Sequence, residues 1–154
     1  MPDYAVNKRA RFDYEILETL EAGLVLYGHE VKSIKTGHIS LKNSFVTLKN
    51  TAGAGTPEAY LTSCHIPLYK HAGKMESYEP TRPRKLLLKR SQIKQLIGKT
   101  KEKGLTLVPL KVYNKHRLIK LAFGVGKGKK KIDKRESIKK RETERKLQRF
   151  KKQY

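Results

Sequence analysis

Two stretches of the sequence combine arginine and lysine with aromatic or leucine side chains in a way that suits contact with RNA. The first, NKRARFDY (7–14), places three cations beside Phe12 and Tyr14, and the second, PTRPRKLLLKR (80–90), places three beside a run of leucines. Arginine binds phosphate through two hydrogen bonds and stacks on bases, and aromatic rings provide further stacking surfaces. The candidate cations are Lys8, Arg9 and Arg11 in the first stretch and Arg82, Arg84 and Lys85 in the second.

Each basic stretch alone is weak evidence for RNA binding, because a run of charges is usually just a solvated surface. The net charge of the whole chain strengthens this evidence. The 154 residues contain 36 Lys and Arg against 14 Asp and Glu, which gives a net charge of +22. A charge of this size indicates a polyanionic partner, either nucleic acid or an anionic membrane surface. Together with the two stretches, it favours nucleic acid.

Residues 126–154 differ from the rest of the chain in charge, since fourteen Lys and Arg against four Asp and Glu give them +10 of the +22. From Ile132 on, the segment has only five apolar residues, too few to offset the entropy of ordering it, so we expect it to be largely disordered when free. Its local signals are nevertheless helical, because Asp133 and Glu136 have capping-box spacing and no Gly or Pro follows them. We interpret it as a tail that becomes a helix on a phosphate-lined surface.

Two other interpretations of the tail remain open, a solubilising segment without a specific binding site and a membrane-surface helix. The second is less favoured because the tail lacks the Trp, Phe and Leu face that interfacial helices bury. No apolar run approaches the roughly 20 residues that span a bilayer, and the first residues lack the apolar core of a secretory signal. A lone cysteine, Cys64, rules out an intramolecular disulfide and fits a reducing compartment. We therefore expect a cytoplasmic monomer without a membrane partner.

An enzymatic function has little support in the sequence. Cys64 and His65 are a nucleophile and a base by type, but adjacent residues on a strand point to opposite faces. Cys64 is better explained as a small buried thiol. The five histidines are scattered, no Cys or His pair has zinc spacing, and no glycine-rich loop cradles a phosphate. We expect no catalysis, no cofactor and no metal.

The elements that must position the candidate residues are mainly strands, which alternation and β-branched or aromatic content indicate. Gly23 suggests two strand arms around a bend or bulge, and Pro109 suggests an edge strand or a bulge. The predicted strands are 14–26, 44–50, 58–69, 105–113 and 117–125, with hairpin connections at 51–57 and 114–116.

Two short helices complete the prediction. One lies within SQIKQLIGKTKEKG (91–104), with Ser91 as its N-cap and Gly104 after its end, and the other is EVKSIK (30–35). Several short strands with few helices are typical of a small antiparallel barrel, which also removes the exposed edges of a sheet. The fold class is therefore mainly β, with a closed barrel flanked by short helices.

Several motifs follow one another in the order and spacing of a known family. These motifs are NKRAR (7–11), EAG (21–23), EVKS (30–33), SFV (44–46), RKLLL (84–88), KGLTLVPLKVY (103–113) and GKKKIDKR (128–135). In them the chain resembles the SsrA-binding protein (small protein B) family, the partners of transfer-messenger RNA in bacterial trans-translation. The resemblance covers nearly the whole chain.

The resemblance implies an OB-type RNA-binding β-barrel over residues 1–125 and a basic tail over 126–154 that is disordered until it binds. Family members bind the tRNA-like part of transfer-messenger RNA and deliver it to stalled 70S ribosomes, the barrel standing in for a missing anticodon arm. The tail enters the decoding centre, formed by small-subunit ribosomal RNA, and the empty mRNA channel, where it folds into a helix. A generic structured-RNA-binding or ribosome-assembly protein remains the alternative.

Motif matching carries the family's RNA-binding residues onto this chain. Glu21 matches a carboxylate that can accept hydrogen bonds from guanine or a 2′-hydroxyl, although it could instead be a surface residue paired with a nearby Lys. Leu87 matches the middle leucine of KLLL, and Lys89 stands where many members have Asn. Gly128 matches a junction glycine that we expect to be needed for close approach or a positive φ. The implied RNA-binding residues are Asn7, Lys8, Arg9, Arg11, Glu21, Lys32, Arg82, Arg84, Lys85, Leu87, Lys89 and Gly128.

In the tail, residues 133–135 match a DKR motif that the family uses for accommodation in the decoding centre. Ile132 departs from the family, in which many members have a His or Tyr that could stack on a base, whereas an isoleucine can only pack against one. The implied ribosome-contacting residues are Lys129, Lys130, Lys131, Ile132, Asp133, Lys134, Arg135, Lys139, Lys140, Arg141 and Arg145.

Overall fold

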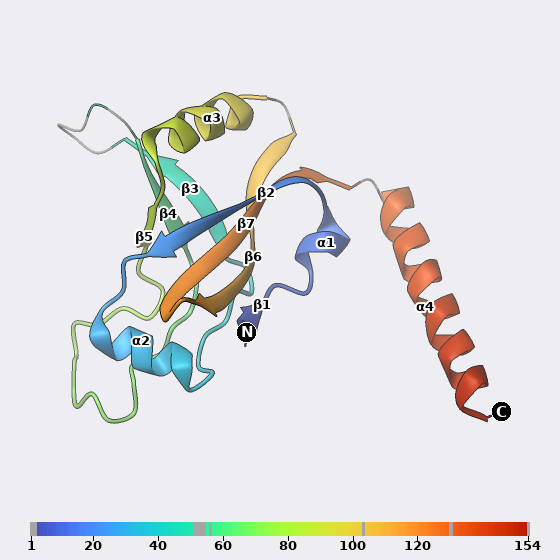
Figure 1. The fold of residues 1–154 in the computed structure, drawn as a ribbon, viewed down its shortest axis with the longest axis horizontal. Coiled ribbons are helices and arrows are strands. Elements are labelled where there is room, and N and C mark those ends of the chain that lie inside the picture. Colours follow the sequence, from blue (N-terminus) through green and yellow to red (C-terminus); the bar gives the residue numbers. More distant parts are fainter. Residues whose placement is uncertain (1–2, 51–54, 56, 103, 130, 154) are drawn as a thin grey trace.

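The computed structural model describes residues 3–50, 55, 57–102, 104–129 and 131–153, in which seven strands and four helices are found (Figure 1). The side chains of residues 131–134, 136–137 and 149–153 lie outside the described set. The elements are β1 (Asp3–Val6), α1 (Ala10–Asp13), β2 (Tyr14–Leu24), α2 (Gly28–Lys35), β3 (Phe45–Lys49), β4 (Glu58–Thr62), β5 (Arg84–Leu87), α3 (Arg90–Thr100), β6 (Leu105–Lys115), β7 (Leu118–Gly128) and α4 (Lys131–Gln153).

All seven strands belong to one antiparallel sheet in the order β1-β6-β7-β2-β5-β4-β3. The sheet curls so that β3, at one edge, lies against β6, the neighbour of the other edge strand β1. In the described part of the chain no ladder joins β1 to β3, and a groove of about 1210 Å³ lies there, lined by both strands, α1 and residues 39–44. The predicted closed barrel is therefore not confirmed, since edge strands of four and five residues leave the sheet open along this groove.

The core lies inside the curl of the sheet and is covered by two helices. Leu61 of β4 and Phe123 of β7 are fully buried in one apolar cluster, to which α2 contributes Ile34 and α3 contributes Leu96. Cys64 belongs to the same cluster, and burial raises the pKa of its thiol to about 12. The prediction of a small buried thiol is confirmed.

β2 runs without a break through Gly23, so the predicted bend at that glycine is wrong. The irregularity of this strand lies between Ile16 and Glu18, where the pairing with β7 shifts register. Gly23 pairs on both sides, with β7 and with Leu87 of β5. A Cβ on Gly23 would lie 3.3 Å from Cδ1 of Leu87. The missing side chain therefore lets β5 join β2 at this point.

β6 and β7 form the predicted hairpin, and both strands are longer than expected. The turn is formed by His116 and Arg117, whose φ angles are 50° and 65°, rather than by residues 114–116. The pairing shifts register between Pro109 and Lys111, although β6 is an inner strand of the sheet. The predicted bulge at the proline is confirmed, and the alternative of an edge strand is wrong.

The glycines near the end of β7 do not interrupt it. A Cβ on Gly124 would lie 2.7 Å from Cγ2 of Ile16, and one on Gly126 would lie 3.1 Å from Cβ of Tyr14. These two glycines therefore allow β7 to pack closely against side chains of β2. Gly128 lacks a positive φ, and a Cβ on it would meet no atom within 4 Å, so neither expected reason for a glycine applies there.

The short helices lie close to their predicted positions. α2 begins two residues before the predicted stretch and ends at Lys35, as expected. α3 begins at Arg90, so Ser91 is not its N-cap; the cap is Lys89, whose N–H donates to Oε1 of Gln92 at 2.9 Å. Gly104 follows the end of α3 with a φ of 85°. Lys89 is therefore placed at the junction of β5 and α3.

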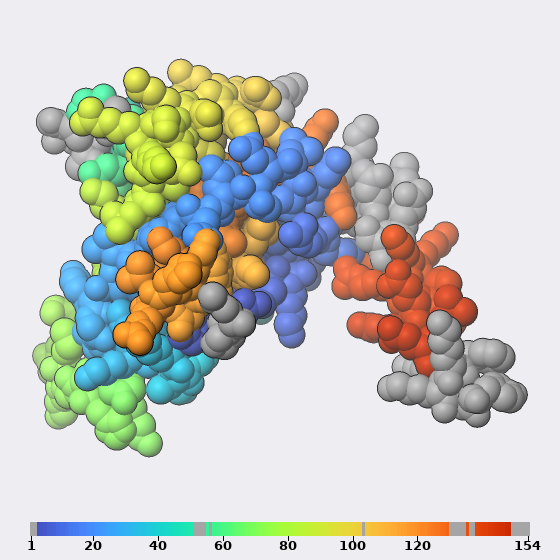
Figure 2. All heavy atoms as spheres, viewed as in Figure 1, coloured from blue at the N-terminus to red at the C-terminus, as the bar shows by residue number. Residues whose placement is uncertain are grey.

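α4 projects from the rest of the molecule as one helix (Figures 1 and 2). The helical signals of the tail are confirmed, since good helix formers without Gly or Pro form a continuous helix here, and disorder of the free tail stays a prediction. The side chains of residues 138–148 are all exposed. Arg141 nevertheless contacts the body, with its guanidinium carbon 5.2 Å from the ring centroid of Phe12 in α1. In its described part, α4 is a solvated helix whose neighbour is α1.

Candidate nucleic-acid interface

Glu21 lies on the exposed face of β2, where two side chains of β6 reach its carboxylate. The Tyr113 hydroxyl donates to Oε2, and Nζ of Lys115 donates to Oε1 at 3.2 Å. The hydrogen bond from Tyr113, together with the charge of Lys115, holds the pKa of the Glu21 carboxyl below its ordinary value. Burial and the adjacent carboxylate raise the pKa of Tyr113. The carboxylate is thus ionised, oriented and exposed, and it is also paired with a lysine.

The neighbouring strand β5 brings the second matched residue to the same part of the sheet. Leu87 pairs with Gly23, two residues along β2 from Glu21, and its side chain is 56% exposed. Lys89 is exposed at the start of α3, two residues after Leu87. The sheet therefore brings the three residues of this group together, although β5 lies far from β2 in the sequence.

The first basic stretch lies beside α1, near the beginning of β2. Nδ2 of Asn7 donates to the carbonyl oxygen of Pro109 at 2.9 Å, so the amide of Asn7 fastens this stretch to the bulge of β6. Lys8, Arg9 and Arg11 are exposed. The Arg9 guanidinium lies 5.5 Å from the Phe12 ring and 3.5 Å from a carboxylate oxygen of Asp13. In Figure 1, α1 lies on the other side of the molecule from β5 and α3, so the two basic stretches do not form one cluster.

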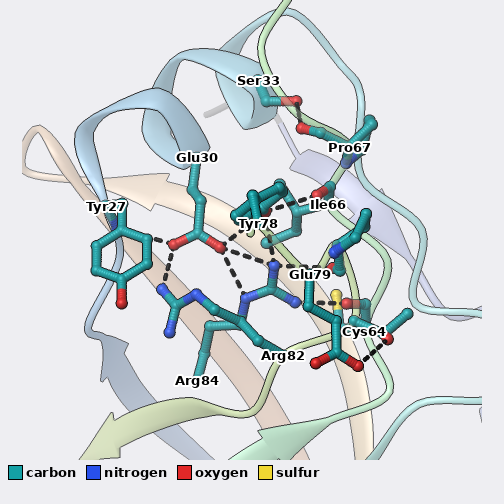
Figure 3. A network of polar contacts seen from close by, with 12 residues as sticks. Tyr27, Glu30, Ser33, Cys64, Ile66, Pro67, Tyr78, Glu79, Arg82 and Arg84 are labelled. Carbon is teal, nitrogen blue, oxygen red and sulfur yellow. Dashed lines mark hydrogen bonds and ion pairs between the residues drawn. The ribbon is translucent and has the colours of Figure 1, made fainter. Parts of the chain in front are cut away.

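Arg84, which the sequence predicts to contact a phosphate, is buried in the structure. Its side chain is wholly buried, and Nη2 lies 2.7 Å from Oε2 of Glu30, which is also wholly buried (Figure 3). Its remaining donors bond to the hydroxyl of Tyr78 and to the carbonyl oxygens of Cys64 and Pro80. An RNA phosphate cannot reach this guanidinium in the folded protein, so the expectation for Arg84 is wrong.

The other two cations of the second stretch, Arg82 and Lys85, are also paired with carboxylates. Glu30 binds Arg82, whose side chain is 22% exposed, and it accepts the N–H of Tyr27 at 2.8 Å. Burial raises the pKa of the Glu30 carboxyl, but Arg82, the Tyr27 N–H and Arg84 together hold it below its ordinary value. Lys85 is half-buried and pairs with Glu58 at 3.1 Å. Only part of the predicted cationic stretch is therefore at the surface.

Lys32 and the first tail residues lie at opposite ends of the molecule. Lys32 is exposed on α2, with Nζ 5.9 Å from the centroid of the Tyr69 ring. Lys129 is tied to the start of β2, because its N–H donates to the carbonyl oxygen of Asp13 at 2.9 Å and its Nζ donates to that of Arg11 at 2.7 Å. The tail thus begins beside the first basic stretch.

The predicted tail residues are distributed along α4. Lys130 lies outside the described residues, and Lys131, Ile132, Asp133 and Lys134 have a described backbone in α4 but no described side chain. The remaining ones are exposed cations, namely Arg135, Lys139, Lys140, Arg141 and Arg145.

Two residues that position side chains of the candidate interface were missed by sequence reasoning, the buried Glu30 and Tyr113. Glu30 has a weak signal, since it stands at the third position of α2 and bonds back to the N–H before the helix, as in a capping box. Tyr113 has none, because its contact with Glu21 depends on β7 lying between their strands. Both depend on strand pairing that links distant parts of the sequence.

No group of three metal-ligating side chains is found in the residues that the structure describes, and none of the described helices is long and apolar enough to cross a membrane. The exposed features are instead a fixed carboxylate beside a leucine and a lysine on one face of a curled sheet, and arginines and lysines on α1 and α4. With a net charge of +22, they define a small, basic protein of the nucleic-acid-binding class.

The chain belongs to the SmpB protein family, whose model matches residues 4–153. The SsrA-binding protein of Acaryochloris marina is 49% identical over 143 residues, which cover 93% of this chain and 89% of the relative. That of Halalkalibacterium halodurans is 50% identical over 145 residues, covering 94% and 90%. A chain of the solved structure described as "tmRNA-SmpB: a journey to the center of the bacterial ribosome" is 43% identical, with a TM-score of 0.63 and coverage of 82% of this chain and 84% of that chain.

Proposed function

We propose that this protein binds the tRNA-like part of transfer-messenger RNA and brings it to stalled ribosomes for trans-translation. The observation that carries the proposal is identity of about half the residues, along nearly the whole chain, with proteins named for binding SsrA. The similarity to a chain from a tmRNA–SmpB structure supports the same partners. In this function the protein is an adaptor without catalytic activity, and it acts where ribosomes are, in the cytoplasm.

The RNA surface that we propose is the exposed face of β2 and β5. There the carboxylate of Glu21 is held in one orientation by Tyr113 and Lys115, so it can accept hydrogen bonds from a guanine edge or a 2′-hydroxyl. Leu87 offers an exposed apolar contact next to it, and Lys89 offers a cation for a phosphate. The surface therefore combines one acceptor, one apolar contact and one charge.

The ribosome-contacting part that we propose is α4 with α1 at its root. α4 presents exposed cations along the described part of a helix that leaves the body, so ribosomal RNA can surround it. Binding to phosphates would neutralise these cations and release counterions. The DKR motif at 133–135 lies in the first turns of this helix, and Arg141 further along it contacts Phe12 of α1. We place this end of the molecule in the decoding centre and the mRNA channel.

A competition experiment separates this function from generic RNA binding. A labelled tRNA-like fragment of transfer-messenger RNA is bound at fixed salt, and a large excess of bulk tRNA is added. The proposed function requires that the complex survive, whereas a generic structured-RNA binder would lose the label to the competitor. Salt dependence alone cannot discriminate, since about six phosphate contacts weaken either kind of binding roughly a thousandfold between 50 and 200 mM.

A further inference from the structure

The exposed face of β2 continues beyond the end of the strand. The N–H of Val25 still donates to the carbonyl oxygen of Lys85 at 3.0 Å, so the chain remains beside β5. Leu24 and Leu26 pack against the core, whereas Val25 is 46% exposed and Tyr27 is 55% exposed. This alternation places Tyr27 on the same side as Glu21, at the end of the proposed RNA surface.

The ring of Tyr27 is fixed by a stacked arginine. The guanidinium carbon of Arg82 lies 4.0 Å from the ring centroid, and Arg82 is itself bound to the buried Glu30 (Figure 3). The backbone of Tyr27 is held by the same carboxylate through its N–H. One buried group therefore positions both members of the pair, and ligand binding need not order either of them.

We propose that Tyr27 and Arg82 form a stacking site for one unpaired base of the RNA that lies on this face. The inference rests on the proposed function and adds a contact to it. A tyrosine residue that is 55% exposed offers a base a surface to stack on, and the guanidinium behind the ring adds a cation next to the phosphate backbone. At about 3.3 Å per residue, Tyr27 is roughly 20 Å along the chain from Glu21, so it receives a different nucleotide.

An RNA base fits this site better than an apolar group of a protein partner. The pair sits on a chain of net charge +22, and the two elements that follow its members also carry cations, Lys32 exposed on α2 and Lys85 half-buried on β5. Tyr78 and His29 stack edge to face behind the pair at 4.7 Å between ring centroids, so the aromatic side chains beneath it are already packed. The Tyr27 ring also contacts His29, at 5.7 Å between ring centroids and an interplanar angle of 39°, but of these three aromatic residues it is the exposed one and can present ring surface to a ligand.

The absence of tryptophan from the sequence allows a direct test. Tyr27→Trp introduces a single tryptophan, which can be excited selectively over the tyrosines and retains a stacking surface. Its emission should be quenched when the tRNA-like fragment of transfer-messenger RNA binds, at a concentration that matches the affinity of the unaltered protein. Phe45→Trp is the matched control, because Phe45 is 43% exposed on the edge strand β3, away from β2, and its emission should not change.

The affinity of an alanine variant tests the energetic contribution. Tyr27→Ala should bind the fragment about 5- to 100-fold more weakly at fixed salt, with an unchanged slope of affinity against salt, because stacking releases no counterion. Tyr27→Trp should restore the affinity, and Phe45→Ala should not lower it. Far-ultraviolet circular dichroism and thermal unfolding verify that each variant is folded.

Each remaining outcome decides against the inference. Unchanged affinity of Tyr27→Ala, or unchanged emission of Tyr27→Trp at saturation, excludes a base on this ring. Quenching only by small ribosomal subunits, and not by the fragment, assigns the base to ribosomal RNA and removes the site from the proposed surface. If the unaltered protein itself shows no preference for the fragment over bulk tRNA, the proposed function fails, and that failure is distinct from an effect of Tyr27.

Discussion

The guanidinium of Arg84 and the carboxylate of Glu30 form an ion pair that is wholly inside the protein, with Nη2 and Oε2 2.7 Å apart. The pair ties β5 to α2, and through Arg82 and Tyr78 it also holds residues of the long connection between β4 and β5. A cation that the sequence suggests for RNA is thus used to assemble the end of the sheet that carries Tyr27.

Breaking this pair should destabilise the protein strongly. Arg84→Met leaves the Glu30 carboxylate buried without its main partner, so the free energy of unfolding should fall by about 3–5 kcal/mol in urea titrations. Lys85→Met is the matched control, because its partner Glu58 is half-buried, and the loss should be at most about 1 kcal/mol. The double variant Glu30→Leu/Arg84→Met should recover a large part of the loss. Equal losses for Arg84→Met and Lys85→Met would contradict this account.

The stability of the folded protein should depend on pH because of the Glu30 carboxyl. Its folded-state pKa lies below the ordinary value of 4.5, so the ionised carboxylate stabilises the folded protein. This contribution is complete above about pH 4.5 and is lost as the pH falls through the lower, folded-state pKa. Urea midpoints measured from pH 7 to pH 3 should therefore fall more steeply for the unaltered protein than for Glu30→Gln. Parallel curves would show that the carboxylate does not contribute in this way.

The two glycines at 124 and 128 of β7 should respond differently to the same change. In Gly124→Ala the new methyl group would lie 2.7 Å from Cγ2 of Ile16, so we expect a loss of about 1–3 kcal/mol by thermal or urea unfolding. In Gly128→Ala nothing lies within 4 Å, and reduced freedom of the unfolded chain should leave stability unchanged or slightly higher. A large loss of stability in Gly128→Ala would contradict this account, because neither a close contact nor a positive φ requires glycine there.

Glu21 should contribute to RNA binding through its oriented carboxylate. Glu21→Ala should weaken binding of the tRNA-like fragment by about 1.5–3 kcal/mol, the range for a hydrogen bond to a charged group. Tyr113→Phe removes the donor that orients the carboxylate, so it should give a smaller loss in the same titration. The control is Glu15→Ala, which removes an exposed glutamate from the other end of β2. Equal effects of the two glutamate variants would indicate a response to net charge alone.

Removal of residues 132–154 should separate RNA binding from ribosome rescue. The truncated protein keeps the complete sheet and should bind the tRNA-like fragment with nearly unchanged affinity. It lacks the cationic helix and should fail to support peptide tagging on stalled ribosomes in a reconstituted translation assay. Glu21→Ala provides the opposite control, with weakened RNA binding and an intact tail. Tagging by the truncated protein would refute this division of roles.

The elements that could be predicted from the sequence are those with local signals. The β6–β7 hairpin follows from two alternating runs, the end of α2 from the predicted stretch 30–35, and the irregularity of β6 from Pro109. The helical state of α4 also follows from its composition.

The features that could not be predicted depend on pairing between distant segments. Burial of Arg84 requires Glu30, which the sequence places in another motif, and the orientation of Glu21 requires Tyr113 across β7. The opening of the sheet depends on how far β1 and β3 extend, and strand ends are poorly determined by alternation. The charge pattern alone overestimates how many cations of residues 80–90 are exposed, because the carboxylates that pair with them lie elsewhere in the sequence.

Because Lys129 is bonded to Asp13, β2 sets the distance between the start of α4 and the proposed RNA surface around Glu21. The root of α4 is bonded to the residue that precedes this strand, and Glu21 lies roughly 25 Å further along it at about 3.3 Å per residue. Because β2 is paired with β7 along this stretch, its length cannot vary much. Inserting two residues into β2 and two into β7 would increase the distance between α4 and the bound RNA, while every side chain that contacts RNA would be retained.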